Sequence, residues 1–175
     1  MRLERPSMKW KDEHEAYMDE WDEEGMTPSS FHLDSGISYE NYLEELRKRE
    51  AGQGKWLPCT NYFLVDDTDR VVGMIDIRHD LNEYLHQFGG HIGYGVRPSE
   101  RRKGYATRML AEALKVTDTL GIKTVLVTCN EKNIGSAKTI QHNGGKEDVS
   151  RTEEDGTVIR RFWIERERYY EEHVF

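Results

Sequence analysis

The sequence predicts a mixed α+β domain whose sheet starts as an antiparallel meander. Three observations predict this class. Two strand-like runs flank an acidic turn at residues 66–69, helical and strand-like stretches alternate between residues 105 and 143, and a second hairpin pattern lies near the end of the chain. A chain of 175 residues with 36% hydrophobic residues can bury a real core. We therefore expect one domain over residues 1–175.

Two helices are expected before the sheet. Residues 1–6 can form a short strand. Aromatic and apolar side chains recur every three or four positions in residues 9–24, which predicts a helix that Gly25 ends. Residues 27–36 have the composition of a loop. Ser38 is a suitable N-cap for a second helix that runs to about Glu50.

The central sheet is expected from three strand-like segments. Residues 61–65 and 71–78 form a hairpin around the turn Asp66-Asp67-Thr68-Asp69, whose composition suits a turn. Residues 80–88 connect this hairpin to a third strand over residues 89–96.

The last third of the chain alternates helix and strand. An amphipathic helix over residues 105–120 has Gly121 in place to end it, and residues 124–129 form a buried strand. Asn133 can cap a helix that runs to about Asn143. The strands of the final hairpin are residues 146–151 and 157–165.

Charge and composition exclude several classes of protein. The net charge of -8 argues against general nucleic-acid binding, and no apolar run reaches the roughly 20 residues of a membrane span. The histidines have no metal-site spacing, so we expect no metal. Cys59 and Cys129 have no metal or redox spacing, and the N-terminus lacks the apolar segment of a signal peptide. We expect a cytoplasmic protein.

The charges are unevenly distributed. Residues 9–24 carry eight acidic side chains against two lysines, which indicates either a solvated helix face or a surface that attracts a cationic substrate. Residues 97–108 carry five basic side chains against Glu100. The basic residues begin the segment Arg101-Arg102-Lys103-Gly104-Tyr105-Ala106, which connects an expected strand to an expected helix. Unpaired N–H groups at a helix start bind anions, and a glycine lets the backbone approach them. This segment predicts a phosphate or pyrophosphate site.

The same segment resembles the coenzyme motif of the GNAT superfamily of acyl-CoA N-acyltransferases, Arg/Gln-x-x-Gly-x-Gly/Ala, here preceded by Val96-Arg97-Pro98. Downstream, Asn130, Asn133, Ser136 and the stop at residues 143–145 lie where the family has its second coenzyme-contacting segment. The resemblance covers residues 71–164. Over this part the chain is similar to a predicted bacterial-type acetyltransferase. It implies a mixed, mostly antiparallel sheet of six to seven strands flanked by about four helices, with the central strands splayed apart.

The resemblance also implies a division of the chain. Residues 1–58 would be a two-helix segment on the acceptor side, residues 59–145 the sheet and acetyl-CoA-binding core, and residues 146–175 a C-terminal hairpin. The implied reaction moves an acetyl group from acetyl-CoA to a primary amine of a small molecule, a peptide or a protein, by direct attack in a ternary complex. Dimers are common in the family, so a homodimer is possible.

Coenzyme contacts are carried over position by position. The backbone of Val96 would pair with the pantetheine amides, and its N–H would polarise the thioester carbonyl. The amides of residues 102–107 would hold the pyrophosphate, with basic side chains flanking it. The implied set is Val96, Arg101, Arg102, Lys103, Gly104, Tyr105, Ala106, Thr107, Asn133 and Ser136.

The expected general base is less well defined. Many GNAT enzymes carry an ionisable residue at the positions of Gly90 and Ile92, which are not ionisable here. His91 lies on the opposite face of the strand and would need a bulge to serve, whereas Tyr94 has the matching parity.

Ionisable residues on or after the preceding strand are the other candidates for the base. Among Asp76, His79, Asp80 and Glu83 we favour Glu83 and then Asp80, near the expected acceptor entrance.

The family's usual acid is a tyrosine on the last helix, and Ile140 occupies that position. A second hypothesis therefore stays open: a non-catalytic module that binds acyl-CoA or a partner and retains the GNAT fold. Turnover with an amine would separate the two.

Overall fold

The computed structural model describes residues 1–22, 25–55 and 57–166. Seven strands form one sheet in the order β1-β2-β3-β4-β5-β7-β6, in which β4 and β5 are parallel and all other neighbours are antiparallel. The strands are β1 (Arg2–Glu4), β2 (Cys59–Val65), β3 (Val71–Arg78), β4 (Ile92–Val96), β5 (Thr124–Asn130), β6 (Lys146–Thr152) and β7 (Val158–Glu165). The expected mostly antiparallel α+β sheet is confirmed.

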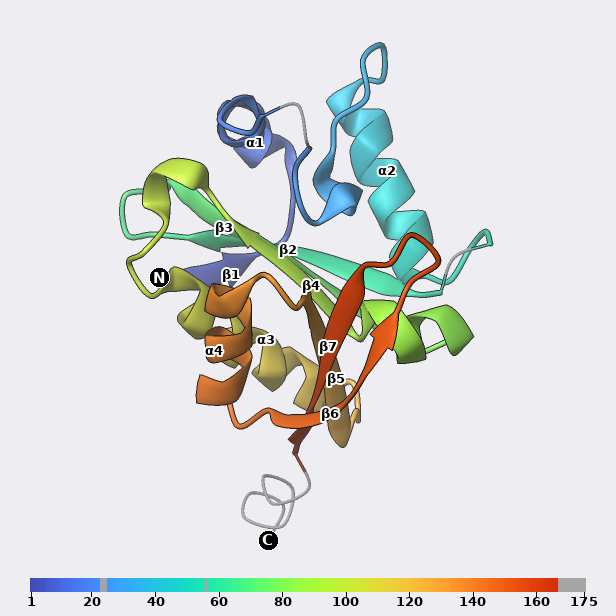
Figure 1. Ribbon diagram of the computed structural model, residues 1–175. Helices are drawn as coiled ribbons and strands as arrows, with labels where there is room; N and C mark the ends of the chain where they lie inside the picture. Colours follow the sequence, from blue (N-terminus) through green and yellow to red (C-terminus); the bar gives the residue numbers. More distant parts are fainter. Residues whose placement is uncertain (23–24, 56, 167–175) are drawn as a thin grey trace, which may run out of the picture.

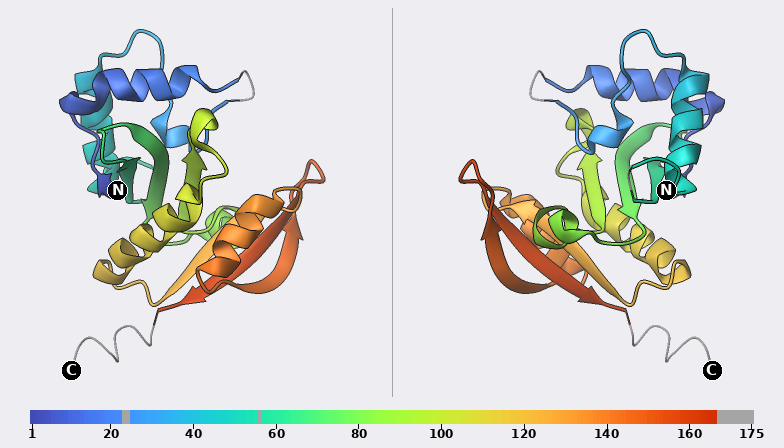
Figure 2. Two further views of the ribbon diagram at one scale, coloured as in Figure 1. Left: turned by 90° about the vertical axis from the view of Figure 1, so that its left-hand side faces the viewer. Right: turned by 90° about the vertical axis from the view of Figure 1, so that its right-hand side faces the viewer.

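Four α-helices pack on this sheet: α1 (Lys11–Asp19), α2 (Tyr39–Glu50), α3 (Tyr105–Thr119) and α4 (Ile134–His142). Short helical turns lie at η1 (Met8–Trp10), η2 (Ser29–Phe31), η3 (Leu85–Gly89) and η4 (Pro98–Glu100). In Figures 1 and 2, α1 and α2 lie on one face of the sheet and α3 and α4 on the other.

Three element boundaries differ from the expected ones. The first helix ends at Asp19 instead of Glu24, a residue outside the described part of the chain, and the expected loop contains η2. The expected connection over residues 80–88 contains most of η3, a single wide helical turn that ends at Gly89. The third central strand starts at Ile92 rather than Gly89, because Gly90 has a φ of 67° and no strand geometry. Side-chain periodicity alone could not show these local breaks.

Two cores form on the two faces of the sheet. The larger core joins β3, β4, β5 and β7 to α3 and α4, and includes Ile75, Leu110 and Ile140. The smaller one packs α1 and the following loop on the β1–β3 end through aromatic side chains such as Tyr17 and Phe31. The aromatic residues of the N-terminal helices are therefore mainly packing residues.

The sheet opens between its two central strands. Beyond one register pair, Ile92 with Val127, β4 and β5 form no further ladder in the described chain. Figure 2 shows the half that carries β4 diverging from the half that carries β5, β6 and β7. The expected splay is present.

Candidate active site

The splay begins at a histidine inserted between the two strands. The N–H of His91 donates to the carbonyl of Leu126 at 2.7 Å, and the N–H of Leu126 donates to Nδ1 of the His91 ring at 2.9 Å. The ring thus takes the place of a backbone carbonyl of β4. Burial lowers the pKa of His91 to about 4, so the ring is neutral at pH 7. Because its Nδ1 lone pair is occupied, the geometry gives His91 a structural role in opening the gap.

Past this point the backbone of β4 faces the gap. The N–H of Arg97 bonds to Val72 and the carbonyl of His91 accepts from Arg78, so the odd-numbered residues of β4 bond to β3. By the alternation of an antiparallel ladder, the polar backbone groups of Tyr94 and Val96 point toward β5. A strand-like ligand can pair with them, as the resemblance implies for Val96.

The basic loop after β4 forms an anion cradle. Arg102 and Gly104 both have left-handed backbones, with φ of 65° and 80°, and α3 starts without a side-chain cap. The N–H of Arg108 bonds to Gly104 at 3.3 Å, so the amides of Tyr105, Ala106 and Thr107 have no carbonyl one turn back. A Cβ on Gly104 would meet no protein atom within 4 Å. Successive amides next to left-handed residues form a nest that suits phosphate oxygens.

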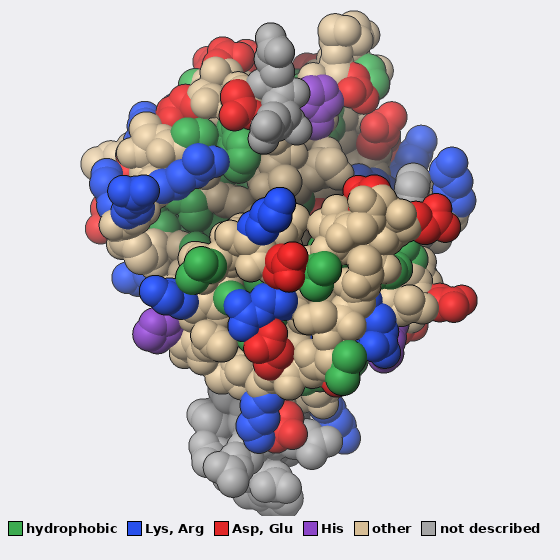
Figure 3. Space-filling model, in the orientation of Figure 1, with side chains coloured by type: hydrophobic (Ala, Val, Ile, Leu, Met, Phe, Trp, Pro, Cys, Tyr) green, Lys and Arg blue, Asp and Glu red, His purple; other side chains and the backbone are tan. Residues whose placement is uncertain are grey.

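The loop's side chains differ in their availability. Lys103 is bound to Glu100 at 2.8 Å, whereas Arg101 lies 5.0 Å above the ring of Trp21. Trp21, Arg101, Val96 and Ala106 all line one side of the gap beside α4. The Trp21 Nε1 is buried without a hydrogen-bond partner in the described chain, so it can donate to a ligand in the gap. Figure 3 shows Lys and Arg side chains beside a hollow on this face.

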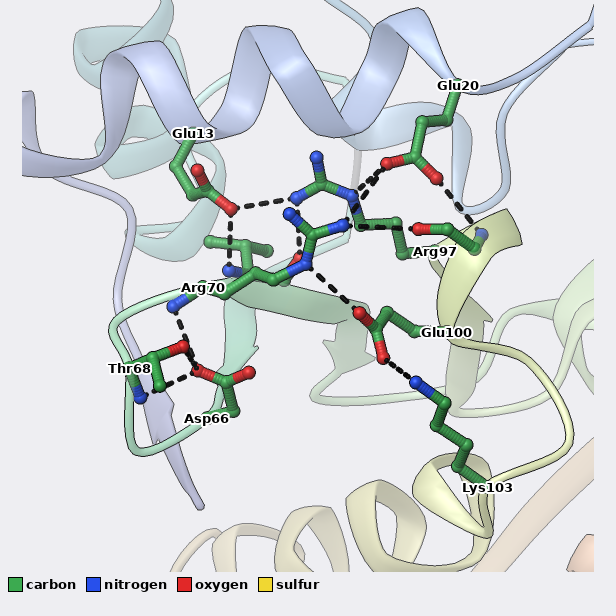
Figure 4. Close-up of polar contacts among 10 residues, drawn as sticks. Glu13, Glu20, Asp66, Thr68, Arg70, Arg97, Glu100 and Lys103 are labelled. Atoms are coloured by element: carbon green, nitrogen blue, oxygen red, sulfur yellow. Dashed lines mark hydrogen bonds and ion pairs between the residues drawn. The ribbon is translucent and has the colours of Figure 1, made fainter.

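A buried ion network holds the cradle in place (Figure 4). Arg97 has only 4% of its surface exposed and bonds to Glu13 and Glu20 of the α1 segment. Glu20 also accepts the N–H of Ser99 at 3.0 Å. Partial burial opposes ionisation, yet the bonds from Ser99 and Arg97 lower the pKa of Glu20 to about 2. Two of the acidic residues on the first helix therefore position the turn into the cradle.

The segment that the sequence predicts as the second coenzyme contact faces the same gap. Asn133 caps α4 by accepting the N–H of Ser136 at 3.0 Å, which confirms the expected cap. The Tyr94 hydroxyl forms a short hydrogen bond with the Ser136 hydroxyl, and Asn133, Tyr94 and Ser136 all line the gap. Burial raises the pKa of Tyr94 to about 12, against a smaller lowering by the bond with Ser136, so the phenol stays protonated. Ile140 is fully buried in the larger core.

A buried carboxylate lies beside the gap on the α1–α2 face. Asp76 is 3% exposed, accepts hydrogen bonds from the Ser30 hydroxyl at 2.6 Å and the Gly93 N–H at 3.2 Å, and is 3.6 Å from Arg78. Gly93 and Arg78 line the gap themselves. A charged residue inside the apolar run Val71–Ile77 was the sequence signal for this site, and our preference for later carboxylates passed over it.

The preferred carboxylates lie elsewhere. Asp80 and Glu83 are exposed and do not line the gap, although their neighbours Asn82 and Tyr84 line a pocket next to it. A Cβ on Gly90 would lie 2.6 Å from the carbonyl oxygen of Leu126, and Ile92 belongs to the larger core, so neither position opens on the α1–α2 face. The structure brings Tyr94, Val96, Asn133, Ser136 and the cradle together.

Within residues 1–22, 25–55 and 57–166 no group of His, Cys, Asp or Glu side chains could hold a metal ion. No helix in these residues is long and apolar enough to cross a membrane. An amide cradle that leads into a gap with strand-like edges has the geometry that an elongated, phosphate-bearing ligand requires.

Comparison with known proteins specifies the class. A family model described as an acetyltransferase (GNAT) domain matches residues 8–146, so the chain belongs to the GNAT acetyltransferase family. Members are acetyl-CoA-dependent N-acetyltransferases, and the orphaned Trp21 donor and the open space at Gly104 fit that cosubstrate.

Solved structures share the fold. A mutant spermidine N-acetyltransferase from Vibrio cholerae is 16% identical, with 97% of each chain covered and a TM-score of 0.66. A dodecameric form of the Vibrio cholerae enzyme is 16% identical over 98% of this chain and 96% of that chain, also with a TM-score of 0.66. No curated protein sequence matches the chain.

Proposed function

We propose that this protein acetylates a primary amine of a small molecule or peptide by direct attack within a ternary complex. The observation that carries the proposal is the continuity of the site. The gap that starts at the α3 cradle ends beside the buried carboxylate of Asp76, which faces the opposite, α1–α2 side of the sheet. Acetyl-CoA can therefore enter from one face and the amine from the other, and the two ligands can meet at Gly93.

The chain's groups have distinct roles in this proposal. The cradle amides and Arg101 hold the pyrophosphate, and the backbone of Val96 pairs with the pantetheine arm. When bound, acetyl-CoA supplies an activated acyl group on sulfur. The amine nitrogen attacks the thioester carbonyl carbon, a C–N bond forms, the C–S bond breaks, and the thiolate leaves with the electron pair.

Asp76 is the candidate to take the amine's proton. An amine with a pKa near 10.4 is mostly protonated at pH 7.4, and freeing it costs about 4 kcal/mol at ~1.36 kcal/mol per pKa unit. A carboxylate that positions the ammonium and receives its proton, directly or through water, lowers this barrier. The protonated Tyr94 hydroxyl, paired with Ser136 in the gap, is the candidate donor to the departing thiolate.

The division of the chain follows the same arrangement. We propose that residues 1–58 form the acceptor side of the site and that residues 59–145 bind acetyl-CoA. The hairpin from residue 146 completes the sheet. Of that last segment, residues 167–175 lie outside the described part. The homodimer stays a prediction that light scattering can test.

The test combines binding and turnover. We expect acetyl-CoA to bind in calorimetry and thiol release to depend on one class of amine. Asp76→Asn should lower kcat by at least about a hundredfold without changing acetyl-CoA affinity. The matched change Asp155→Asn, at an exposed position of the β6–β7 turn that lines neither the gap nor the pocket, should change neither quantity. Acetyl-CoA binding with no turnover over a broad amine panel would instead support the non-catalytic module.

A further inference from the structure

A pocket on the acceptor side opens next to the gap. It encloses about 490 Å³, enough for a small metabolite, and Ser30, Arg49, Cys59, Asp76, Arg78 and Tyr84 are among its lining residues. Ser29 and Arg78 line both this pocket and the gap. A ligand in the pocket can therefore extend into the gap past Arg78.

The pocket is more cationic than the chain as a whole. Its described lining holds three basic residues, Arg49, Lys55 and Arg78, and one carboxylate, Asp76, whereas the chain has a net charge of -8. Arg78 is anchored by the carbonyls of Gly89 and Gly90 at 3.0 and 3.2 Å. Two acidic side chains at α1, Glu13 in the helix and Glu20 at its C-cap, are bound to Arg97 instead.

Arg49 is the least satisfied of these cations. It lies in the last turn of α2, its Nε is buried with no hydrogen-bond partner, and it forms no ion pair within the described residues. A buried donor without an acceptor is costly, so such a group usually meets a ligand or water. Arg49, Arg78, Asp76 and Cys59 all line this one pocket.

The two signs of charge are ordered along the pocket. Asp76 bonds to Gly93 of the gap, whereas Arg49 lines the pocket but not the gap. A ligand that spans the pocket therefore meets a carboxylate at the gap end and an unpaired guanidinium further out. A polycationic amine would place its second charge against Arg49 and Arg78, which is unfavourable.

We propose that the acceptor is an amine that also carries a carboxylate, as in an amino acid, and that Arg49 binds this carboxylate while Asp76 receives the amine. A planar guanidinium can bind a carboxylate through two parallel hydrogen bonds, which fixes the orientation of the ligand. This inference rests on the proposed function, because it names the acceptor of the same site.

The test uses pairs of amines that differ only in the carboxylate. Each of several amino acids is compared with its decarboxylated amine, and spermidine is included. Each rate is expressed relative to the concentration of the unprotonated amine. We expect kcat/KM to be at least tenfold higher for the amino acid of the preferred pair. Arg49→Gln should raise KM for that amino acid at least tenfold and leave the decarboxylated amine unchanged. Arg47→Gln, an exposed change on the same helix, should affect neither.

The outcomes separate this inference from the proposed function. Turnover that favours spermidine or the decarboxylated amines, or an equal response of both substrates to Arg49→Gln, would overturn the inference and leave the acetyltransferase proposal standing. If no amine is acetylated, binding of the amino acids to the CoA-loaded protein is measured by calorimetry. Binding that Arg49→Gln abolishes would support the carboxylate site without catalysis, and absence of binding would refute it.

Discussion

Gly104→Val tests the cradle. The residue has a φ of 80°, a left-handed backbone that a β-branched side chain rarely adopts, and its substitution should cost about 2 kcal/mol of folding stability. For a domain of this size that corresponds to a fall in Tm of about 4–8 °C. The new side chain would meet no protein atom near its Cβ and would project into the space where the pyrophosphate must approach. We therefore expect acetyl-CoA to bind at least tenfold more weakly, or about 1.4 kcal/mol.

A matched control exists at the other end of the same helix. Gly121 has a φ of 75° and equally open surroundings, so Gly121→Val carries the same backbone strain far from the cradle. Thermal unfolding should show similar losses for both variants, whereas calorimetry should show weaker acetyl-CoA binding for Gly104→Val alone. Unchanged affinity in a folded Gly104→Val protein, or an equal loss in Gly121→Val, would refute the assignment of the cradle.

Three other predictions concern stability and catalysis. Arg97→Met should destabilise the protein by about 3–5 kcal/mol in urea unfolding, because it removes the cation of the partly buried Glu13 and leaves Glu20 only the more distant Arg70, at 3.6 Å; a loss below 1 kcal/mol would contradict the network. Burial lowers the pKa of both His14 and His91 to about 4, below the unfolded value of 6.5, so the unfolded state binds more protons in this range. The unfolding free energy should then fall from pH 6.5 to pH 4, by up to about 3 kcal/mol per histidine, and a flat profile would exclude neutral buried rings. Glu83→Gln should keep kcat/KM within twofold in the thiol-release assay, and a larger loss would restore Glu83 as a catalytic candidate.

The cradle was predictable because its signal is local. A strand, a run of basic residues with a glycine and an amphipathic helix are adjacent in the chain. Residues 96–107 could therefore be predicted as an anion site without knowing what packs around them. The Asn133 cap is also local, since the residue and the N–H it accepts are three positions apart. The same reasoning misplaced the end of the first helix and the start of β4, where tertiary contacts decide the backbone.

The acceptor side was not predictable in this way. Asp76, Ser30 and Arg49 come from β3, the loop after α1 and the end of α2, and no pattern in the sequence shows that they share one pocket. The alternation of the strand predicts that His91 is a packed residue. Its position between β4 and β5 depends on the hydrogen bond that its ring accepts from Leu126, 35 positions later.

By itself, the sequence determined that this chain forms an α+β sheet, and it predicted an anion site at one turn of that sheet, because hydrophobic periodicity and helix-end chemistry act over a few residues. Only the tertiary structure decided which charged side chains line the proposed acceptor pocket. The acidic residues Glu13 and Glu20 turn inward to Arg97, while the Nε of Arg49 has no hydrogen-bond partner in the described part of the chain. The physical reason is that the role of a charged side chain depends on the groups around it. Folding brings these groups together from distant parts of the chain.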